Sequence, residues 1–297
     1  MTRVLFITGF NRSGTTLLTS AVTAATQART LTVGDLAKHM PSVRKFLATA
    51  SKHGTIIDRG VDRLPVSEST PEEYCWLLNE VTGEFVFEAQ AAQAGVLDSL
   101  IDELAGEQGA PVVLKNPWDT GRERLLLDHF ADSCVIVIRR DLSAIEASQK
   151  RALNRMATSS RYPRALIGDP HSRAEMLGAL LNPVARQRLV GDFRQRVRRT
   201  AVRLGHGASK LPLDRVAFLS YDELRADPFA GASWAAHLLD PNALGEAIAA
   251  QTFGEYNRTG TPSLTVKAID WYWARSWRQA RARQIRAGIL ARPGRSV

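Results

Sequence analysis

The feature that most constrains this chain is a strand, a glycine-framed loop and a helix, placed one after another near its start. Residues 4–8 read Val-Leu-Phe-Ile-Thr and predict a short buried strand, because four of the five are β-branched or aromatic. The loop 9–14 has glycine at both ends, and an apolar helical pattern follows over residues 15–22. Such an arrangement presents backbone N–H groups and a helix N-terminus to an anion. The pattern therefore predicts a phosphate-binding loop.

The side chains of this loop also suit an anion. In one-letter code the loop and the first helical residues read GFNRSGTT. The glycines allow backbone angles and a close approach that a Cβ would block. The hydroxyl groups add donors, and the arginine adds a fixed positive charge. The candidate ligand-binding residues are Asn11, Arg12, Ser13, Gly14, Thr15 and Thr16.

The loop differs from that of common nucleoside-triphosphate enzymes. Their pattern is G-x-x-x-x-G-K-[ST], and here Thr15 stands at the lysine position. That lysine normally reaches the β- and γ-phosphates, so its loss argues against ordinary ATP or GTP hydrolysis. The cation has moved to Arg12, inside the loop.

This loop resembles the 5′-phosphosulfate loop of the sulfotransferases that use 3′-phosphoadenosine 5′-phosphosulfate (PAPS), whose motif is P-[KR]-S-G-T-T. Asn11 stands where that motif has proline. We identify the chain as a bacterial member of this family, with a motif style similar to that of the tyrosylprotein sulfotransferases. The resemblance implies a P-loop-like α/β fold and PAPS as cofactor, with 3′-phosphoadenosine 5′-phosphate (PAP) as its product.

A second block of residues resembles the 3′-phosphate motif of that family. The apolar run 134–138 predicts a strand, and two arginines follow it. In open parallel sheets, ligands bind at the carboxyl ends of the strands. In the family, an arginine at a strand end and a serine eight residues later bind the 3′-phosphate. The spacing from Arg140 to Ser148 matches, so the resemblance implies Arg140 rather than Arg139.

Two shorter resemblances lie further along the chain. Tyr221, in Tyr-Asp-Glu-Leu, resembles a family segment whose tyrosine lies near the adenine, although it could equally be an aromatic residue at the edge of the core. Arg258, in Asn-Arg-Thr-Gly, resembles an arginine-glycine loop that closes over the 3′-phosphate.

The resemblance also implies roles in catalysis. Sulfuryl transfer requires an acceptor in line, removal of its proton and stabilisation of charge on the leaving nucleotide. We assign the leaving-group role to Arg12. Lys115 precedes Pro117 in a pattern that resembles the family's Lys-x-Pro element, and we assign it to the transferred sulfuryl oxygens. The alternative for Lys115 is a surface lysine at a strand end.

The general base is harder to find. Phenol and steroid sulfotransferases carry a histidine two residues after the equivalent lysine, where this chain has Pro117. Tyrosylprotein sulfotransferases use a glutamate some twenty residues after the loop cation. Asp35 lies 23 residues after Arg12 and is our candidate base, with His39 one helical turn later as the reserve. A structural role for Asp35 at a helix N-terminus is the alternative.

The wider pattern predicts one α/β domain over residues 1–297, with a central parallel β-sheet flanked by helices. We expect helical cap insertions at about 36–80 and 151–210, and a basic C-terminal helix at about 267–290. Residues 69–74 read as a helix start, with a hydroxyl cap, a proline and two acids. The expected strands are 3–8, 111–115, 134–138 and 215–220.

Composition limits the partners and the location. The net charge is +9, and residues 267–297 hold eight basic side chains against one acid, which suits an anionic ligand or polyanion, or else a solvated helix face. We find no membrane-length apolar run, signal peptide or Cys/His cluster, and we therefore expect a cytoplasmic protein that uses no metal. The acceptor is expected to be a small molecule (a natural product, carbohydrate or lipid). We expect no nucleic-acid partner and leave a homo-oligomer open.

Two rival functions stand beside the sulfotransferase. A divergent nucleotide kinase would use Arg12 for the missing lysine and would need a metal-binding aspartate at a strand end, for which Asp58 and Asp119 are poorly placed. A non-enzymatic nucleotide- or polyanion-binding protein would use the arginine-rich tail, and its binding would depend steeply on salt.

Overall fold

A five-stranded parallel β-sheet forms the centre of this computed structural model, which describes residues 4–53, 59, 65–158, 161–167, 170–251 and 263–291. The strand order is β2-β3-β1-β4-β5, and every neighbouring pair is parallel. The strands are β1 (Val4–Thr8), β2 (Arg29–Thr30), β3 (Val112–Lys115), β4 (Cys134–Arg139) and β5 (Val216–Ser220). The parallel α/β prediction and its four strands are confirmed, and β2 is an additional short edge strand.

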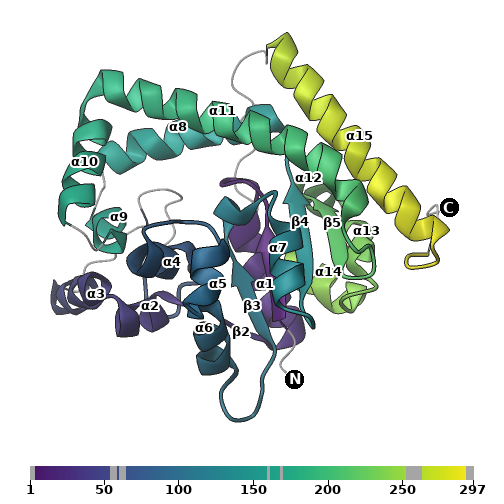
Figure 1. The fold of residues 1–297 in the computed structure, drawn as a ribbon, viewed down its shortest axis with the longest axis horizontal. Coiled ribbons are helices and arrows are strands. Elements are labelled where there is room, and N and C mark those ends of the chain that lie inside the picture. Colours follow the sequence, from purple (N-terminus) through teal and green to yellow (C-terminus); the bar gives the residue numbers. More distant parts are fainter. Residues whose placement is uncertain are drawn as a thin grey trace.

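Helices surround this sheet on both faces (Figure 1). The α-helices are α1 (Thr15–Thr26), α2 (Val33–His39), α3 (Pro41–His53), α4 (Cys75–Thr82), α5 (Ala89–Gln93), α6 (Val96–Ala105), α7 (Glu123–His129), α8 (Leu142–Thr158), α9 (Arg161–Leu166), α10 (Pro170–Leu181), α11 (Pro183–Gly207), α12 (Tyr221–Ala226), α13 (Pro228–Ala232), α14 (Pro241–Ala249) and α15 (Leu264–Arg286). The short 3₁₀ helices are η1 (Pro117–Asp119), η2 (Ala208–Lys210) and η3 (Ser233–Ala235).

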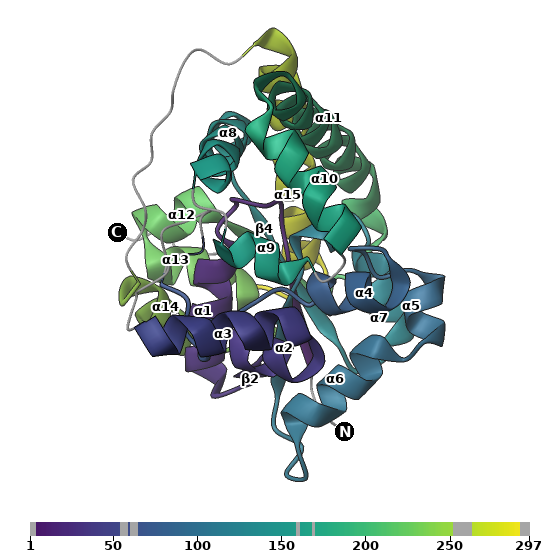
Figure 2. The ribbon, with the colours of Figure 1, turned by 90° about the vertical axis from the view of Figure 1, so that its left-hand side faces the viewer.

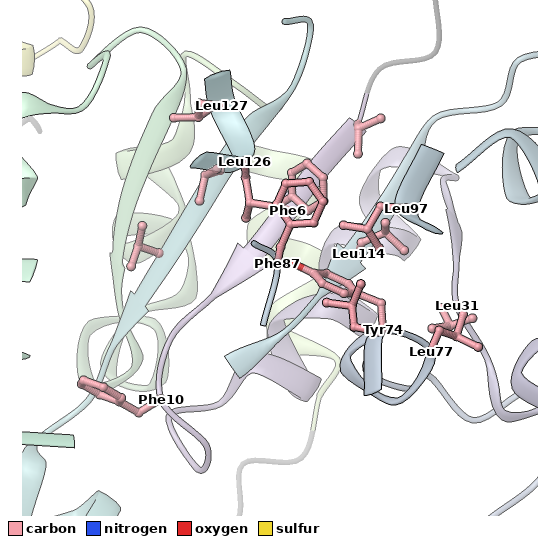
Figure 3. Close-up of a cluster of buried hydrophobic side chains, with 14 of the residues drawn as sticks. Phe6, Phe10, Leu31, Tyr74, Leu77, Phe87, Leu97, Leu114, Leu126 and Leu127 are labelled. Carbon is pink, nitrogen blue, oxygen red and sulfur yellow. The ribbon is translucent and has the colours of Figure 1, made fainter. Parts of the chain in front are cut away.

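Alternating residues of each strand supply the two faces of the sheet. In β1, Leu5 and Ile7 join the cluster that α1 and α14 cover, whereas Val4 and Phe6 join the opposite cluster. Figure 3 shows Phe6 among side chains of β3, α6 and α7. Both faces of the strands are buried, as the continuous apolar runs in the sequence predict.

A layer of long helices lies over the carboxyl ends of the strands. Figure 1 shows α8 and α11 side by side above this edge, with α15 packed along α11. In Figure 2, α9 lies between α3 and the α8–α10 pair. Within the described ranges, no helix combines the length and the apolarity needed to cross a membrane.

One local prediction was wrong. The residues that read as a helix start are not helical, and α4 begins only at Cys75. Tertiary hydrogen bonds hold the preceding segment extended, because Glu72 N donates to Leu31 O at 2.8 Å and Tyr74 N donates to Lys115 O at 3.3 Å. These bonds fasten residues 72–74 beside the ends of β2 and β3.

Candidate active site

The glycine-framed loop follows β1 at the carboxyl edge of the sheet. Gly9 and Gly14 have φ values of +144° and +100°, angles that residues with a Cβ rarely adopt. Arg12 also lies in the left-handed region, with φ +76°, and Ser13 N donates to Phe10 O at 2.9 Å. Gly14 occupies the N-cap of α1 and has no side chain to cap the first-turn N–H groups. The loop and helix thus form a site suited to an anion.

Ser13 provides a test of whether the loop fits such a ligand. Its side chain is fully buried, and Ser13 Oγ makes no hydrogen bond to any described residue. Buried hydroxyl groups nearly always have a partner, because an unpaired one retains its full desolvation cost. An anionic oxygen in the loop would supply the missing acceptor. The residues present therefore fit a phosphate or sulfate group.

Lys115 reaches this loop from the end of β3. Its side chain is completely buried, and Lys115 Nζ donates to Thr16 Oγ1 at 2.9 Å. The same nitrogen lies 3.8 Å from Glu73 Oε1. Lys115 is therefore a buried residue of the site rather than a surface lysine at a strand end.

Glu73 is a functional candidate that the sequence analysis missed. Its carboxylate lies beside Lys115, whereas the neighbouring Glu72 is bound by Arg59 and Tyr162 at 2.9 and 2.7 Å. Burial raises the pKa of Glu73, and the nearby Lys115 ammonium only partly offsets this effect. The Glu73 side chain is 13% exposed, and a mostly buried carboxyl with a raised pKa beside a lysine is typical of acid–base sites.

Arg140, Ser148 and Arg12 form one hydrogen-bonded group. Arg140 Nη1 donates to Arg12 O at 2.8 Å, and Arg12 Nε donates to Ser148 Oγ at 3.1 Å. Arg140 comes directly after β4, and Ser148 lies on α8, which starts at Leu142. The strand end and the following helix thus bring the two predicted 3′-phosphate ligands to the loop.

Tyr221, the first residue of α12 and directly after β5, completes this cluster. Its ring centroid lies 4.4 Å from the guanidinium carbon of Arg140. It also packs against the loop, since a Cβ on Gly14 would lie 2.5 Å from Tyr221 Cδ2. The aromatic ring therefore contacts both the loop and Arg140.

The other arginine of the strand-end pair has a different environment. Arg139 Nη2 pairs with Asp270 Oδ1 of α15 at 2.8 Å, and its guanidinium carbon lies 5.4 Å from the Trp273 ring centroid. Arg139 thus fastens α15 to β4, while Arg140 contacts the loop.

Asp35 and His39 lie on α2. The Asp35 carboxylate accepts hydrogen bonds from Thr32 N and from Lys38 Nζ at 3.0 and 2.8 Å, and forms a capping box with Thr32. Burial acts to raise the pKa of Asp35, but these hydrogen bonds together outweigh it and lower the pKa. His39 Nε2 pairs with Glu103 of α6 at 2.8 Å. The base role of either residue stays a prediction.

Two further expectations concern ligands. Arg258 lies outside the described residues. Among the residues that the structure describes, no group of three or more His, Cys, Asp or Glu side chains could hold a metal ion.

Comparison with known proteins identifies the family of the chain. A family model described as "Sulfotransferase family" matches residues 5–234, which include the loop, Lys115, Arg140 and Tyr221. The chain belongs to the sulfotransferase family. A comparison with curated proteins gave no significant match.

Solved structures of sulfotransferases share the fold. Sulfotransferase STF1 from Mycobacterium tuberculosis H37Rv has a TM-score of 0.52 at 18% identity, covering 92% of this chain and 77% of that one. Sulfotransferase STF9 from Mycobacterium avium has a TM-score of 0.52 at 16% identity, covering 99% of this chain and 79% of that one. At these identities the likeness concerns the fold alone.

Proposed function

We propose that this sulfotransferase uses PAPS and transfers its sulfuryl group in line to a hydroxyl or amine of a small-molecule acceptor. The observation that carries the proposal is the contact of Arg140 with both Arg12 O and the Tyr221 ring. These contacts gather a cationic loop, a second arginine and an aromatic ring at one sheet edge, which suits a nucleotide with two separate phosphate groups.

The binding roles follow from these positions. PAPS, when bound, supplies an activated sulfuryl group on a 3′,5′-bisphosphate nucleotide. The loop amides, with the hydroxyl groups of Ser13, Thr15 and Thr16, bind the 5′-phosphosulfate. Arg140 and Ser148 bind the 3′-phosphate, and Tyr221 contacts the adenine. Arg258 is assigned to the 3′-phosphate from its sequence motif alone.

The catalytic roles rest on charge and burial. Arg12 stabilises negative charge on the bridging oxygen of the leaving nucleotide. Lys115, fixed by Thr16 Oγ1 at 2.9 Å, stabilises charge on the transferred oxygens from a fully buried position. Preorganised cations in a water-poor site stabilise developing charge more than mobile ones in water.

For the general base we propose Glu73 as a third candidate beside Asp35 and His39. Glu73 Oε1 lies 3.8 Å from Lys115 Nζ, so its carboxylate is next to the group assigned to the transferred oxygens. A proton taken from the acceptor by Glu73 would stay within the buried site. The contacts of Asp35, by comparison, are those of a helix-capping carboxylate.

A nucleotide kinase is a weaker alternative. Its metal would need an aspartate at a strand end. Of the two aspartates considered for this role, Asp119 lies within the residues that the structure describes. That side chain is completely buried and accepts hydrogen bonds from Tyr74 Oη at 2.6 Å and Phe87 N at 2.7 Å. These bonds give Asp119 a structural role. Cytoplasmic location, activity without a metal and single-domain organisation stay predictions from the sequence.

Calorimetric titration with PAP, and with ATP, ADP and AMP as controls, tests the proposal. We expect micromolar PAP binding that requires the 3′-phosphate and is lost in Arg140→Ala. Preference for ATP with magnesium would favour the kinase instead. Salt-dependent nucleic-acid binding that survives loss of Arg12 and Arg140 would favour a polyanion-binding protein.

A further inference from the structure

A narrow cleft lies beside the loop, between η1 and α11. Its lining includes Phe10, Asn11, Trp118, Gln149, Phe193 and Arg196. The cleft meets the loop at Asn11, next to Arg12, and meets the end of β3 at Pro117, two residues after Lys115. It therefore opens beside the residues assigned to the transferred group.

The walls of the cleft are largely aromatic. The ring centroids of Trp118 and Phe193 lie 6.0 Å apart, and Phe85 stacks on Trp118 at 5.1 Å with an interplanar angle of 26°. The space between the side chains has a volume of about 20 Å³, so a ligand must part them to enter. Trp118 and Phe193 are only half-buried, so opening the cleft would displace rings that solvent already reaches. A flat ring requires the smallest displacement and gains aromatic contacts on both sides.

Gln149 provides an unsatisfied acceptor in this cleft. Its side chain is 7% exposed, and Gln149 Oε1 makes no hydrogen bond to any described residue. Gln149 Nε2 makes a long contact of 3.5 Å to Asn11 O. A buried amide oxygen without a donor is costly, so it favours a ligand with a hydroxyl or amine hydrogen.

Arg196 gives the rim of the cleft a positive charge. The flanking Arg194 and Arg198 both pair with Glu146, at 3.5 and 2.9 Å, but Arg196 forms no ion pair with any described carboxylate. Its guanidinium carbon lies 4.0 Å from the Trp118 ring centroid, and Arg196 Nη2 donates a long bond of 3.4 Å to Trp118 O. Arg196 is exposed at this rim, and the positive charge of Arg122 lies close to it. The position therefore favours an anionic group.

We propose that this cleft is the acceptor site, and that the acceptor is a planar aromatic compound with a hydroxyl at one end and a carboxylate or similar anion at the other. The hydroxyl lies at the loop, beside Asn11 and Gln149, and the anion binds Arg196. This inference rests on the proposed function, which it extends to a class of acceptor.

Calorimetry with three matched probes tests this proposal. The probes are 4-hydroxybenzoate, its neutral methyl ester, and trans-4-hydroxycyclohexanecarboxylate, which keeps the charge but loses the aromatic ring. Each is titrated with and without saturating PAP, so no turnover is needed. We expect 4-hydroxybenzoate to bind at least tenfold more tightly than either analogue.

Variants then separate the two recognition elements. Arg196→Gln should abolish the preference for the acid over its ester, and Trp118→Leu should abolish the preference for the aromatic ring. Arg199→Gln, exposed on the same helix and outside the cleft, is the matched control and should keep both preferences.

Equal binding of acid and ester, no binding of any probe, or an acid preference that survives Arg196→Gln would overturn the inference. Titration with PAP alone distinguishes the two proposals. Normal PAP binding with no acid preference overturns only the acceptor class, whereas absent PAP binding overturns the proposed function. If PAP does not bind, the titrations of the three probes without PAP still show whether the cleft prefers the aromatic acid.

Discussion

Arg140 Nη1 donates a hydrogen bond to the backbone carbonyl of Arg12 over 2.8 Å, which joins the end of β4 to the loop after β1. Because Arg12 in turn donates to Ser148, the loop, the strand end and α8 form one connected group. The connection explains how residues far apart in the sequence hold a fixed geometry. It also leads to a prediction that separates the two adjacent arginines.

Arg140→Gln should weaken nucleotide binding, whereas Arg139→Gln should weaken the fold. Arg140→Gln should lower PAP affinity tenfold or more, because a hydrogen bond to a charged group contributes about 1.5–3 kcal/mol. Arg139→Gln should leave that affinity within about twofold but lower the free energy of unfolding by about 1–3 kcal/mol, because the Asp270 carboxylate of α15 loses its positively charged partner. Calorimetry and denaturant unfolding measure the two effects. Equal losses of affinity would contradict the assignment.

The choice among general bases has a direct test. Glu73→Gln should lower kcat by about 10²–10⁴, the usual contribution of a general base. Asp35→Asn should change kcat little but destabilise the protein by about 0.5–2 kcal/mol, because Asp35 completes the capping box of α2. Steady-state kinetics and thermal unfolding of both variants check this. A large loss of kcat in a stable Asp35→Asn variant, or in His39→Gln, would move the role to that residue.

The same base predicts a pH dependence. A general base acts only when deprotonated, so kcat/KM should rise with pH through the pKa of Glu73. Burial raises that pKa above its ordinary value of 4.5, so the rise of kcat/KM with pH, the acidic limb of the pH profile, should lie above pH 4.5. The limb should disappear in Glu73→Gln. A limb that persists unchanged in this variant would assign the titration to another group.

The sequence predicted most of the fold because its signals are local. Continuous apolar runs marked four strands, and the glycine spacing marked the loop. The edge strand β2 has two residues and no such run, so it was missed. The helix expected to start near Thr70 failed for a tertiary reason: Glu72 N and Tyr74 N donate to carbonyls at the ends of neighbouring strands.

The candidate site was only partly predictable for the same reason. Motif spacing selected Arg140 and Ser148, and the structure brings both to the loop. Glu73 was interpreted as one of two acids in a first helical turn, and only the hydrogen bonds that fix residues 72–74 place it beside Lys115. Likewise, nothing in the arginine-rich pattern of 183–207 distinguishes Arg196, which faces the cleft, from its paired neighbours.

Lys115→Met should impair catalysis while keeping the fold. Methionine has a similar length, so the fully buried position stays filled, but the charge beside Thr16 is lost. We expect kcat to fall about 10²–10³-fold, as for removal of one preorganised donor. Because the Lys115 charge lowers the pKa of Glu73, the acidic limb of the residual activity should also move to higher pH. Unchanged kcat would remove Lys115 from the mechanism.

The packing of Tyr221 against the loop gives the last prediction. Gly14→Ala places a Cβ 2.5 Å from Tyr221 Cδ2, at a residue whose φ is +100°. Gly83→Ala is the matched control, because φ there is +77° but a Cβ would meet nothing within 4 Å. Both variants should lose about 1 kcal/mol or more of stability from backbone strain, as measured by denaturant unfolding.

Only Gly14→Ala should also weaken PAP binding, by tenfold or more, because either the Tyr221 ring, which contacts Arg140, or the loop backbone must shift. Titrations with PAP and with adenosine, which lacks both phosphates, separate the two causes. Weaker binding of both PAP and adenosine indicates a displaced ring, whereas weaker binding of PAP alone indicates a distorted loop. Full PAP affinity in Gly14→Ala would mean that neither the ring nor the loop takes part in binding the nucleotide.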